Sequence, residues 1–315
     1  MTGIEPSFFV VGSVRVGSTL LRLLIGHHSK ICACDEMEYI LSGIEMDKAG
    51  KSARQYADFL ACHRVFLKYQ LDTPAPTNFK AMAENIVASL AAKDGRGLQG
   101  GAVHNDFAHL ADVWPNAKYI FLDRDPRDVA KSVMNMGWAG TGWRAADYWL
   151  KSKENWKKLC TVVKPENRLE LRFEDLIANT ETELTKVCEF LGVEYEPTMV
   201  EIEGDTSYKR PNAAEASSWE KKANPRFVAE VETKIGKPAI LASGYKVSDN
   251  PAISTSLFAR VVLKLKDSWI CTRYRISLYG FRLWLDSVLA RRTGFSSWQN
   301  SVQIRMNAIN VTRLK

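Results

Sequence analysis

The chain has 315 residues, of which 46% are hydrophobic and 25% charged, a composition that supports a large core and argues against disorder over most of its length. The formal charge of +7 is unevenly placed, because residues 251–315 hold 11 basic and 2 acidic side chains and residues 1–250 hold 32 and 34. No apolar run approaches the ~18 residues of a transmembrane helix. Six scattered cysteines and the lack of a signal peptide favour a reducing compartment, so we expect a cytoplasmic protein.

The first predicted elements are a strand and a helix joined by a glycine turn. Residues 7–12, SFFVVG, form a short apolar run typical of a buried parallel strand. Residues 18–28 follow with Leu20, Leu21, Leu24 and Ile25 on one face, which indicates a helix. Strand, glycine turn and helix are the context that a phosphate-binding loop requires.

The turn nearly matches the phosphate-binding pattern G-x-x-x-x-G-K-[ST]. Gly12, Gly17 and Thr19 fit, but Ser18 stands in place of the lysine. Backbone N–H groups at the helix start still bind an oxyanion, and Arg15 supplies a cation inside the loop. The loop therefore fits an anion less highly charged than a nucleoside triphosphate, although an ordinary strand-to-helix turn stays open.

Further along the chain, strands alternate with helices. This order indicates a parallel α/β sheet, and we expect a three-layer sandwich over residues 1–250 with a helical insert on the acceptor side at about residues 37–110. The predicted elements are helices within 52–93 with a break at 72–78, strands at 117–122 and 167–176, a helix from Pro126, and a helix over 181–192.

A second anion site is predicted after the strand at 117–122. Arg124 follows the carboxyl end of this strand, where open α/β sheets bind ligands. Ser132 lies eight residues further on the next helix, and a phosphate fits between its hydroxyl and the guanidinium. The run RDPRD also fits a salt-bridged helix cap, and both interpretations stay open.

Residues 251–315 form a basic amphipathic helical extension. Two interpretations are open for it: helices that pack on the core with Lys and Arg facing water, or a patch for a membrane surface or another anionic partner.

These segments together resemble the sulfotransferase family, which uses 3′-phosphoadenosine 5′-phosphosulfate (PAPS) and releases the 3′,5′-bisphosphate (PAP). Residues 14–21, VRVGSTLL, are similar to the family's P-R-S-G-T-T-L-L, and residues 124–132 match R-D-P-R-D-V-x-x-S without a gap. Residues 171–195 resemble the family's R-Y-E-D-L segment, and residues 217–245 its closing Ser-x-x-W stretch. The four matches occur in the family's order between residues 7 and about 247.

The resemblance implies a role for each matched position. The loop binds the 5′-phosphosulfate, Arg124 and Ser132 bind the 3′-phosphate, and Phe173 borders the adenine. The implied donor-binding residues are Arg15, Val16, Gly17, Ser18, Thr19, Leu20, Arg124, Ser132, Phe173, Ser218, Lys221 and Lys222, with Ser217 beside them.

Two residues are candidates for the general base that deprotonates the acceptor. Glu36 has the spacing from Arg15 of the family branch with a glutamate base, and it is preferred. His104 resembles the histidine base of the small-molecule branch after a shift of a couple of residues. A lysine that often assists the leaving oxygen is missing from residues 99–104, so Arg15 acts alone or Lys68 or Lys80 substitutes.

The sequence thus predicts a sulfotransferase that moves a sulfuryl group, without a metal, to a hydroxyl or amine of a small-molecule, glycan or lipid-linked acceptor, with no nucleic-acid partner. A P-loop nucleotide phosphotransferase and a non-catalytic membrane-associated adaptor are the alternatives. Cys32, Cys34, Cys62 and His63 lack paired C-x₂-C spacing, so no zinc site is expected. The acceptor and the oligomeric state stay open.

Overall fold

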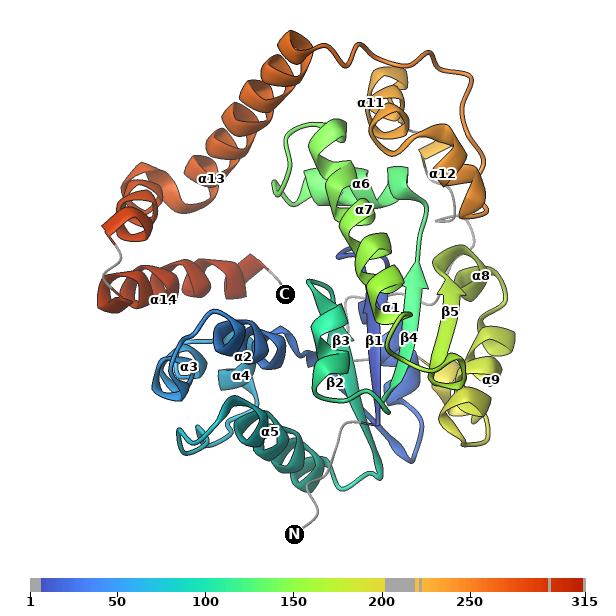
Figure 1. Ribbon diagram of the computed structural model, residues 1–315, viewed down its shortest axis with the longest axis vertical. Coiled ribbons are helices and arrows are strands. Elements are labelled where there is room, and N and C mark those ends of the chain that lie inside the picture. Colours follow the sequence, from blue (N-terminus) through green and yellow to red (C-terminus); the bar gives the residue numbers. More distant parts are fainter. Residues whose placement is uncertain (1–6, 202–218, 221–222, 294–295, 314–315) are drawn as a thin grey trace. The chain divides into compact units, whose positions relative to one another are not determined.

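The computed structural model describes residues 7–201, 219–220, 223–293 and 296–313 (Figure 1). The chain forms two compact units. The first comprises residues 1–129 and 148–223, and the second comprises residues 130–147 and 224–315. The boundary that the sequence predicts at residue 250 stays a prediction.

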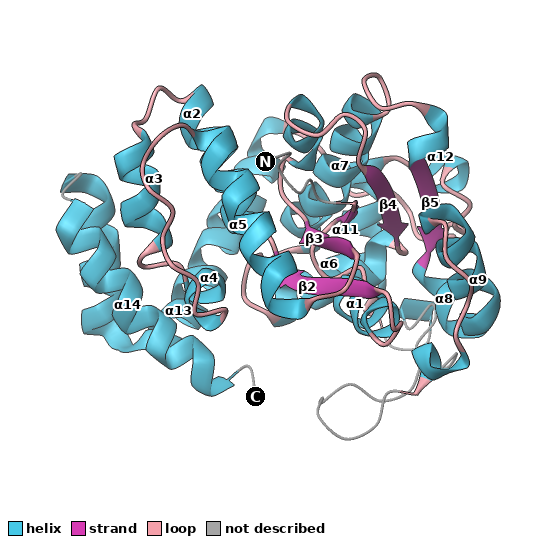
Figure 2. Cartoon of the chain, turned by 90° about the horizontal axis from the view of Figure 1, so that it is seen from below, coloured by secondary structure: helices cyan, strands magenta, loops and turns pink. Residues whose placement is uncertain are grey.

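A five-stranded parallel sheet forms the centre of the first unit, with helices around it (Figure 2). This confirms the predicted α/β class. The strands are β1 (Phe8–Gly12), β2 (Ile31–Glu36), β3 (Leu98–Val103), β4 (Lys118–Asp123) and β5 (Arg168–Arg172), in the order β2-β3-β1-β4-β5.

Helices and short 3₁₀ turns of the first unit connect these strands. The helices are α1 (Ser18–Gly26), α2 (Glu38–Lys48), α3 (Ala53–Leu60), α4 (Arg64–Lys68), α5 (Phe79–Asp94), α8 (Phe173–Ala178) and α9 (Thr180–Leu191). The 3₁₀ turns are η1 (Phe107–Asp112), η2 (Pro165–Asn167) and η3 (Pro197–Val200), and α6 (Pro126–Asn135) and α7 (Gly142–Leu159) each contribute to both units.

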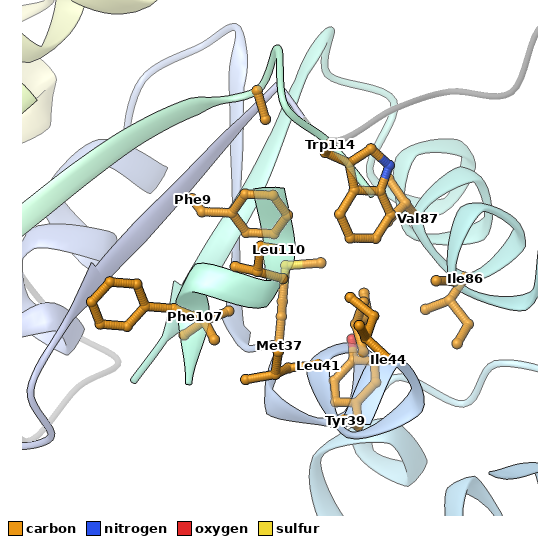
Figure 3. Close-up of a cluster of buried hydrophobic side chains, with 14 of the residues drawn as sticks. Phe9, Met37, Tyr39, Leu41, Ile44, Ile86, Val87, Phe107, Leu110 and Trp114 are labelled. Atoms are coloured by element: carbon orange, nitrogen blue, oxygen red, sulfur yellow. The ribbon is translucent and has the colours of Figure 1, made fainter. Parts of the chain in front are cut away.

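Alternation along the central strand β1 separates two layers of helices. Its five residues are all buried, and neighbouring side chains of a strand point to opposite faces. Phe9 and Val11 belong to a large apolar cluster with side chains from α2, α5, η1 and the first-unit part of α7 (Figure 3). Helix α1 contacts β1, β2 and β3 with its apolar stripe, which includes Leu21 and Leu24.

Side-chain caps fix where the helices of the insert begin. The Ser52 hydroxyl accepts from the Gln55 N–H while the Gln55 side chain accepts from the Ser52 N–H, a capping box at the start of α3. The Asn78 side chain accepts from the Ala81 N–H and starts α5 in the same way. The break predicted at 72–78 therefore ends at a cap.

The second unit is helical in its described part. Besides its parts of α6 and α7, its described helices are α11 (Pro225–Ile235), α12 (Lys237–Ala242), α13 (Leu257–Thr293) and α14 (Ser296–Arg313). Helix α13 breaks at Gly280, where φ is 77°, and α14 packs against it. Within the described part of the chain, we find no helix both long and apolar enough to cross a bilayer.

The sequence prediction differs from the structure at three strands. Residues 173–176 begin α8 instead of continuing the strand predicted over 167–176. Strands β2 and β3 were not predicted at all, so Glu36 is the last residue of a strand and not part of a loop. Both strands lie on one side of β1 and complete the sheet.

Candidate active site

Every strand of the sheet ends at a residue singled out from the sequence. Because parallel strands have their carboxyl ends at one edge of the sheet, these residues gather along that edge, where open α/β sheets bind ligands. The loop of residues 13–17 follows β1, Glu36 ends β2, His104 follows β3, Arg124 follows β4, and Phe173 follows β5.

The loop after β1 has the backbone geometry of an anion-binding turn. Arg15 and Gly17 both have positive φ, 69° and 101°, and such left-handed turns orient consecutive N–H groups toward one point. Helix α1 then begins at Ser18, whose side chain is buried. A Cβ on Gly12 would lie 2.4 Å from the Leu122 carbonyl oxygen, so the strand can end this close to β4 only with glycine.

Phe173 joins the loop to the second predicted anion site. A Cβ on Gly17 would lie 2.4 Å from two carbons of the Phe173 ring, so the ring packs directly on the loop glycine. The Arg124 guanidinium lies over the same ring, 4.2 Å from its centroid, and donates from Nη1 to the Arg15 carbonyl oxygen (3.3 Å). One buried ring thus sets the distance between loop and guanidinium.

Arg124 retains donors for a ligand. Its Nε is buried without a hydrogen-bond partner among the described residues, and no carboxylate in that part of the chain forms an ion pair with it. A buried donor without an acceptor is costly, so this group fits a bound anion such as the 3′-phosphate of PAP.

The other arginine of RDPRD is a structural residue. Arg127 is fully buried and pairs with Asp125 through two bonds, Nε–Oδ1 at 2.8 Å and Nη2–Oδ2 at 2.6 Å. Asp125 also accepts from the Arg127 N–H, as a helix cap does, and from the Trp219 indole N–H at 3.0 Å. The Arg127 guanidinium lies 3.5 Å from the centroid of a Trp219 ring. Asp125 and Arg127 therefore form the salt-bridged cap, and the phosphate site at Arg124 stays a prediction.

His104 connects the phosphate loop to a carboxylate. Its Nε2 lies 2.7 Å from the Ser18 hydroxyl, and its Nδ1 lies 3.4 Å from Oε1 of Glu38. The same oxygen accepts from the backbone N–H of His104 at 2.8 Å and of Asn105 at 3.2 Å. The imidazole is thus fixed between Glu38 and the start of α1.

Charges around His104 favour its protonated form. Burial lowers the pKa of His104, but the neighbouring carboxylates, first of all Glu38 beside Nδ1, together outweigh it, and the pKa is raised above the ordinary value. The Glu36 charge raises this pKa further and the Arg15 charge lowers it, so both groups act on the imidazole. Glu36 itself is exposed at the end of β2.

The remaining predicted residues have different positions. Val16 and Leu20 are buried and support the loop from the core side, while Thr19 is half-buried in the first turn of α1. Ser132 lies on α6, in the part of that helix that belongs to the second unit, and its role stays a prediction. Ser217, Ser218, Lys221 and Lys222 lie outside the described residues.

Lys68 and Lys80, the lysines proposed as substitute cations, both pair with carboxylates outside the loop of residues 13–17. Lys68 pairs with Asp35, which also pairs with Arg22. Lys80 lies on α5 and pairs with Glu84 at 3.7 Å. His104, whose pKa is raised, contacts the loop instead, through the Ser18 hydroxyl.

The cysteine and histidine positions considered for zinc have other contacts. Cys32 and Cys34 are buried neighbours, with sulfur atoms 3.6 Å apart. Burial lowers the pKa of His63 to about 4, and its Nδ1 accepts from the Phe66 N–H at the start of α4. The described residues contain no group of three or more metal-ligating side chains.

Glu38 and Trp219 are site residues that the sequence reasoning did not single out. Glu38 is identified only by the fold, because its partner His104 is 66 positions away. A signal for Trp219 did exist, since it is the tryptophan of the closing Ser-x-x-W stretch, but its contact with Asp125 required the structure.

The comparison with family models assigns the chain to a class of proteins. A model described as the sulfotransferase family matches residues 6–197, which is more than half of the chain. The protein therefore belongs to the sulfotransferase family.

Named relatives are distant. The chain is 23% identical over 212 residues to protein-tyrosine sulfotransferase 2 of Gallus gallus, covering 63% of this chain and 54% of the relative. It is 21% identical over 211 residues to protein-tyrosine sulfotransferase A of Caenorhabditis elegans, covering 63% and 53%. The chain thus spans about half the length of the curated relatives it matches.

Solved structures share the fold. A sulfotransferase domain from the Synechococcus PCC 7002 olefin synthase is 22% identical, with a TM-score of 0.59, over 79% of this chain and 98% of that one. A sulfotransferase domain from the curacin biosynthetic pathway is 17% identical, with a TM-score of 0.56, over 78% and 100%. These likenesses confirm the predicted architecture.

Proposed function

We propose that this protein transfers a sulfuryl group from PAPS to an acceptor hydroxyl or amine, without a metal, with Glu36 as general base. The observation that carries the proposal is the pair of candidate anion sites joined by Phe173. One is the loop before α1, and the other is Arg124, whose buried Nε has no hydrogen-bond partner among the described residues. A donor with a phosphosulfate at one end and a 3′-phosphate at the other matches two sites built around one ring.

The residues present fit such a donor. The N–H groups of residues 15–18 and the N-terminal end of α1 suit the phosphosulfate, and Arg124 suits the 3′-phosphate. Phe173 offers a ring beside both. Trp219, held by Asp125 and Arg127, fixes one point of the closing segment near this edge.

The donor supplies a sulfuryl group whose sulfur forms a bond to the acceptor oxygen or nitrogen as its bond to the phosphate oxygen breaks. Glu36 takes the acceptor proton, and PAP leaves with the electron pair of the broken bond. Arg15 and the loop N–H groups act where negative charge grows on the leaving oxygen, and protonated His104 acts there through the Ser18 hydroxyl that it contacts. In this scheme the His104 imidazolium replaces the lysine that is missing before it.

The geometry supports Glu36 over His104 as base. His104 has one ring nitrogen on Ser18 and the other beside Glu38, so neither nitrogen is directed to a separate acceptor. Its raised pKa also suits a proton donor or cation more than a base. Glu36 is exposed at the same edge, where an acceptor can approach.

Donor binding is tested by calorimetric titration with PAP in EDTA, alongside Mg-ATP. We expect PAP binding that needs no metal, and Arg124→Ala should weaken it about 10- to 100-fold, because a charge-assisted contact is lost. Arg54→Ala, which removes an exposed arginine from α3, is the control and should leave the affinity unchanged. Preference for Mg-ATP would instead favour a phosphotransferase.

Measurement of the turnover rate tests the assignment of Glu36 as the general base. Glu36→Gln should reduce turnover ~100-fold or more with little change in PAP affinity, because a general base contributes about that much. Near-normal turnover would contradict the assignment and promote His104. Tyrosine-containing peptides are the first acceptors to assay, since two relatives are named protein-tyrosine sulfotransferases, with simple alcohols and amines in parallel.

A further inference from the structure

Helix α13 has an apolar face that no other described residue of the second unit covers. Large apolar side chains recur along its first half and are exposed to between 45% and 82%: Leu257, Phe258, Val261, Val262, Leu265 and Trp269. At the ~100° per residue of an α-helix these positions form one stripe. Single exposed apolar residues are ordinary, but a contiguous stripe marks an interaction surface.

The opposite face of the same helix is the one that packs. Asp267 Oδ1 accepts from the N–H groups of Gly140 (2.7 Å) and Thr141 (3.2 Å). A Cβ on Gly140 would lie 2.7 Å from Ile270 Cβ, and Leu263 is buried. The apolar stripe is therefore not the side that holds α13 in its unit.

Basic side chains border the stripe on both sides. Arg260 and Lys264 lie on one flank, and Lys266 and Arg273 on the other, all exposed. The Arg273 guanidinium lies 4.7 Å from the centroid of a Trp269 ring. Asp267, the acid of this half-helix, is turned to the packed side.

We propose that the first half of α13 binds an anionic lipid bilayer, with its apolar stripe in the interface and its basic flanks on the headgroups. An apolar stripe flanked by Lys and Arg with an aromatic residue at its edge is the pattern of a helix that lies in a membrane surface. Anionic headgroups also attract clustered basic side chains. A second copy of this helix is a poorer partner, because face-to-face pairing brings like-charged flanks together.

The proposal goes beyond the proposed sulfotransferase activity and does not depend on it. It is tested by co-sedimentation of the full chain with phosphatidylcholine vesicles, with and without phosphatidylserine. We expect binding only with phosphatidylserine and loss of binding at high salt, because salt screens the headgroup charge.

Two matched double variants locate the binding surface. Val261→Glu with Leu265→Glu changes side chains that are 54% and 65% exposed, and Val162→Glu with Leu241→Glu changes side chains that are 57% and 55% exposed elsewhere. The first pair should weaken binding roughly 100-fold, since it removes apolar insertion and adds repulsion. The second pair should bind like the parent, and circular dichroism melts should show both folded.

Several results would overturn the proposal. Binding to phosphatidylcholine alone as strong as to mixed vesicles would do so, as would equal weakening by the two double variants. Absence of vesicle binding, together with a dimer by light scattering that the α13 variant converts to a monomer, would assign the stripe to self-association.

Discussion

Replacing Gly17 by alanine tests how the phosphate loop is held. A non-glycine residue in the left-handed region costs about 1–2 kcal/mol, and Gly17 has φ 101°. The new Cβ would lie 2.4 Å from the Phe173 ring, and such overpacking costs about 1–3 kcal/mol. We expect Gly17→Ala to lower the free energy of unfolding by roughly 2–5 kcal/mol.

A double-mutant cycle with Phe173→Ala separates the two contributions. Phe173→Ala alone should cost about 3–5 kcal/mol through the cavity it leaves. In the double variant the clash is absent, so the cost should be smaller than the sum of the single costs by about 1–3 kcal/mol.

Gly192→Ala is the matched control, because Gly192 has φ 84° and nothing within 4 Å of its Cβ position. Gly192→Ala should lower the free energy of unfolding only by the cost of an alanine in the left-handed conformation, about 1–2 kcal/mol. Its effect should add to that of Phe173→Ala within about 0.5 kcal/mol. The assay is urea unfolding followed by circular dichroism, with PAP titration on the folded variants. Additivity of Gly17→Ala and Phe173→Ala would refute the contact and the reasoning from it.

Two further predictions concern buried charges in the first unit. Because the pKa of His104 is raised in the folded state, its protonated form stabilises the fold below the unfolded pKa, and this stability is lost as pH rises through the folded pKa. Urea unfolding should therefore show a larger difference in free energy of unfolding between the parent and Glu38→Gln at pH ~6 than at pH ~9. A difference that does not change with pH would contradict this. Arg127→Met leaves the buried Asp125 carboxylate without its cation and should lower the free energy of unfolding by about 3–5 kcal/mol, whereas a cost below about 1 kcal/mol would show that Asp125 is satisfied otherwise.

The sequence predicted the parts of the sheet whose local pattern is strong. Strands β1 and β4 are uninterrupted apolar runs, and the helix starts after them carry glycine and proline signals that depend only on neighbouring residues. The residues proposed for the two anion sites follow these strands, so the local motif was enough to predict that Arg15 and Arg124 lie at the carboxyl edge of the sheet.

Strand β3 was missed for a physical reason. The sequence of β3, LQGGAV, contains two glycines, which lower strand propensity. The structure needs both, because a Cβ on Gly100 would lie 2.4 Å from the Phe8 carbonyl oxygen and one on Gly101 2.5 Å from the Met37 sulfur. Close packing between strand and neighbours is a tertiary requirement that a local pattern does not reveal.

The contacts around His104 also could not be predicted from a local sequence pattern. Ser18, Glu38 and His104 come from three separate segments and meet only because β1, β2 and β3 are neighbours in the sheet. The sequence offered His104 as a base because an isolated imidazole titrates near neutrality. The structure gives it a carboxylate on one side and the loop serine on the other, which changes the role that its chemistry favours.

RDPRD shows how two arginines in one motif acquire different roles. Arg127 lies in the first turn of α6, where Asp125 and Trp219 satisfy its charge, so it stabilises the turn and has little to offer a ligand. Arg124 lies before the helix, stacks on Phe173 and keeps a buried Nε donor that has no partner among the described residues. The buried ion pair fixes the backbone that positions Arg124, and of the two arginines Arg124 is the one without a salt bridge among the described residues. Because the fold already sets the position of this guanidinium, little conformational entropy is lost when an anion binds to it.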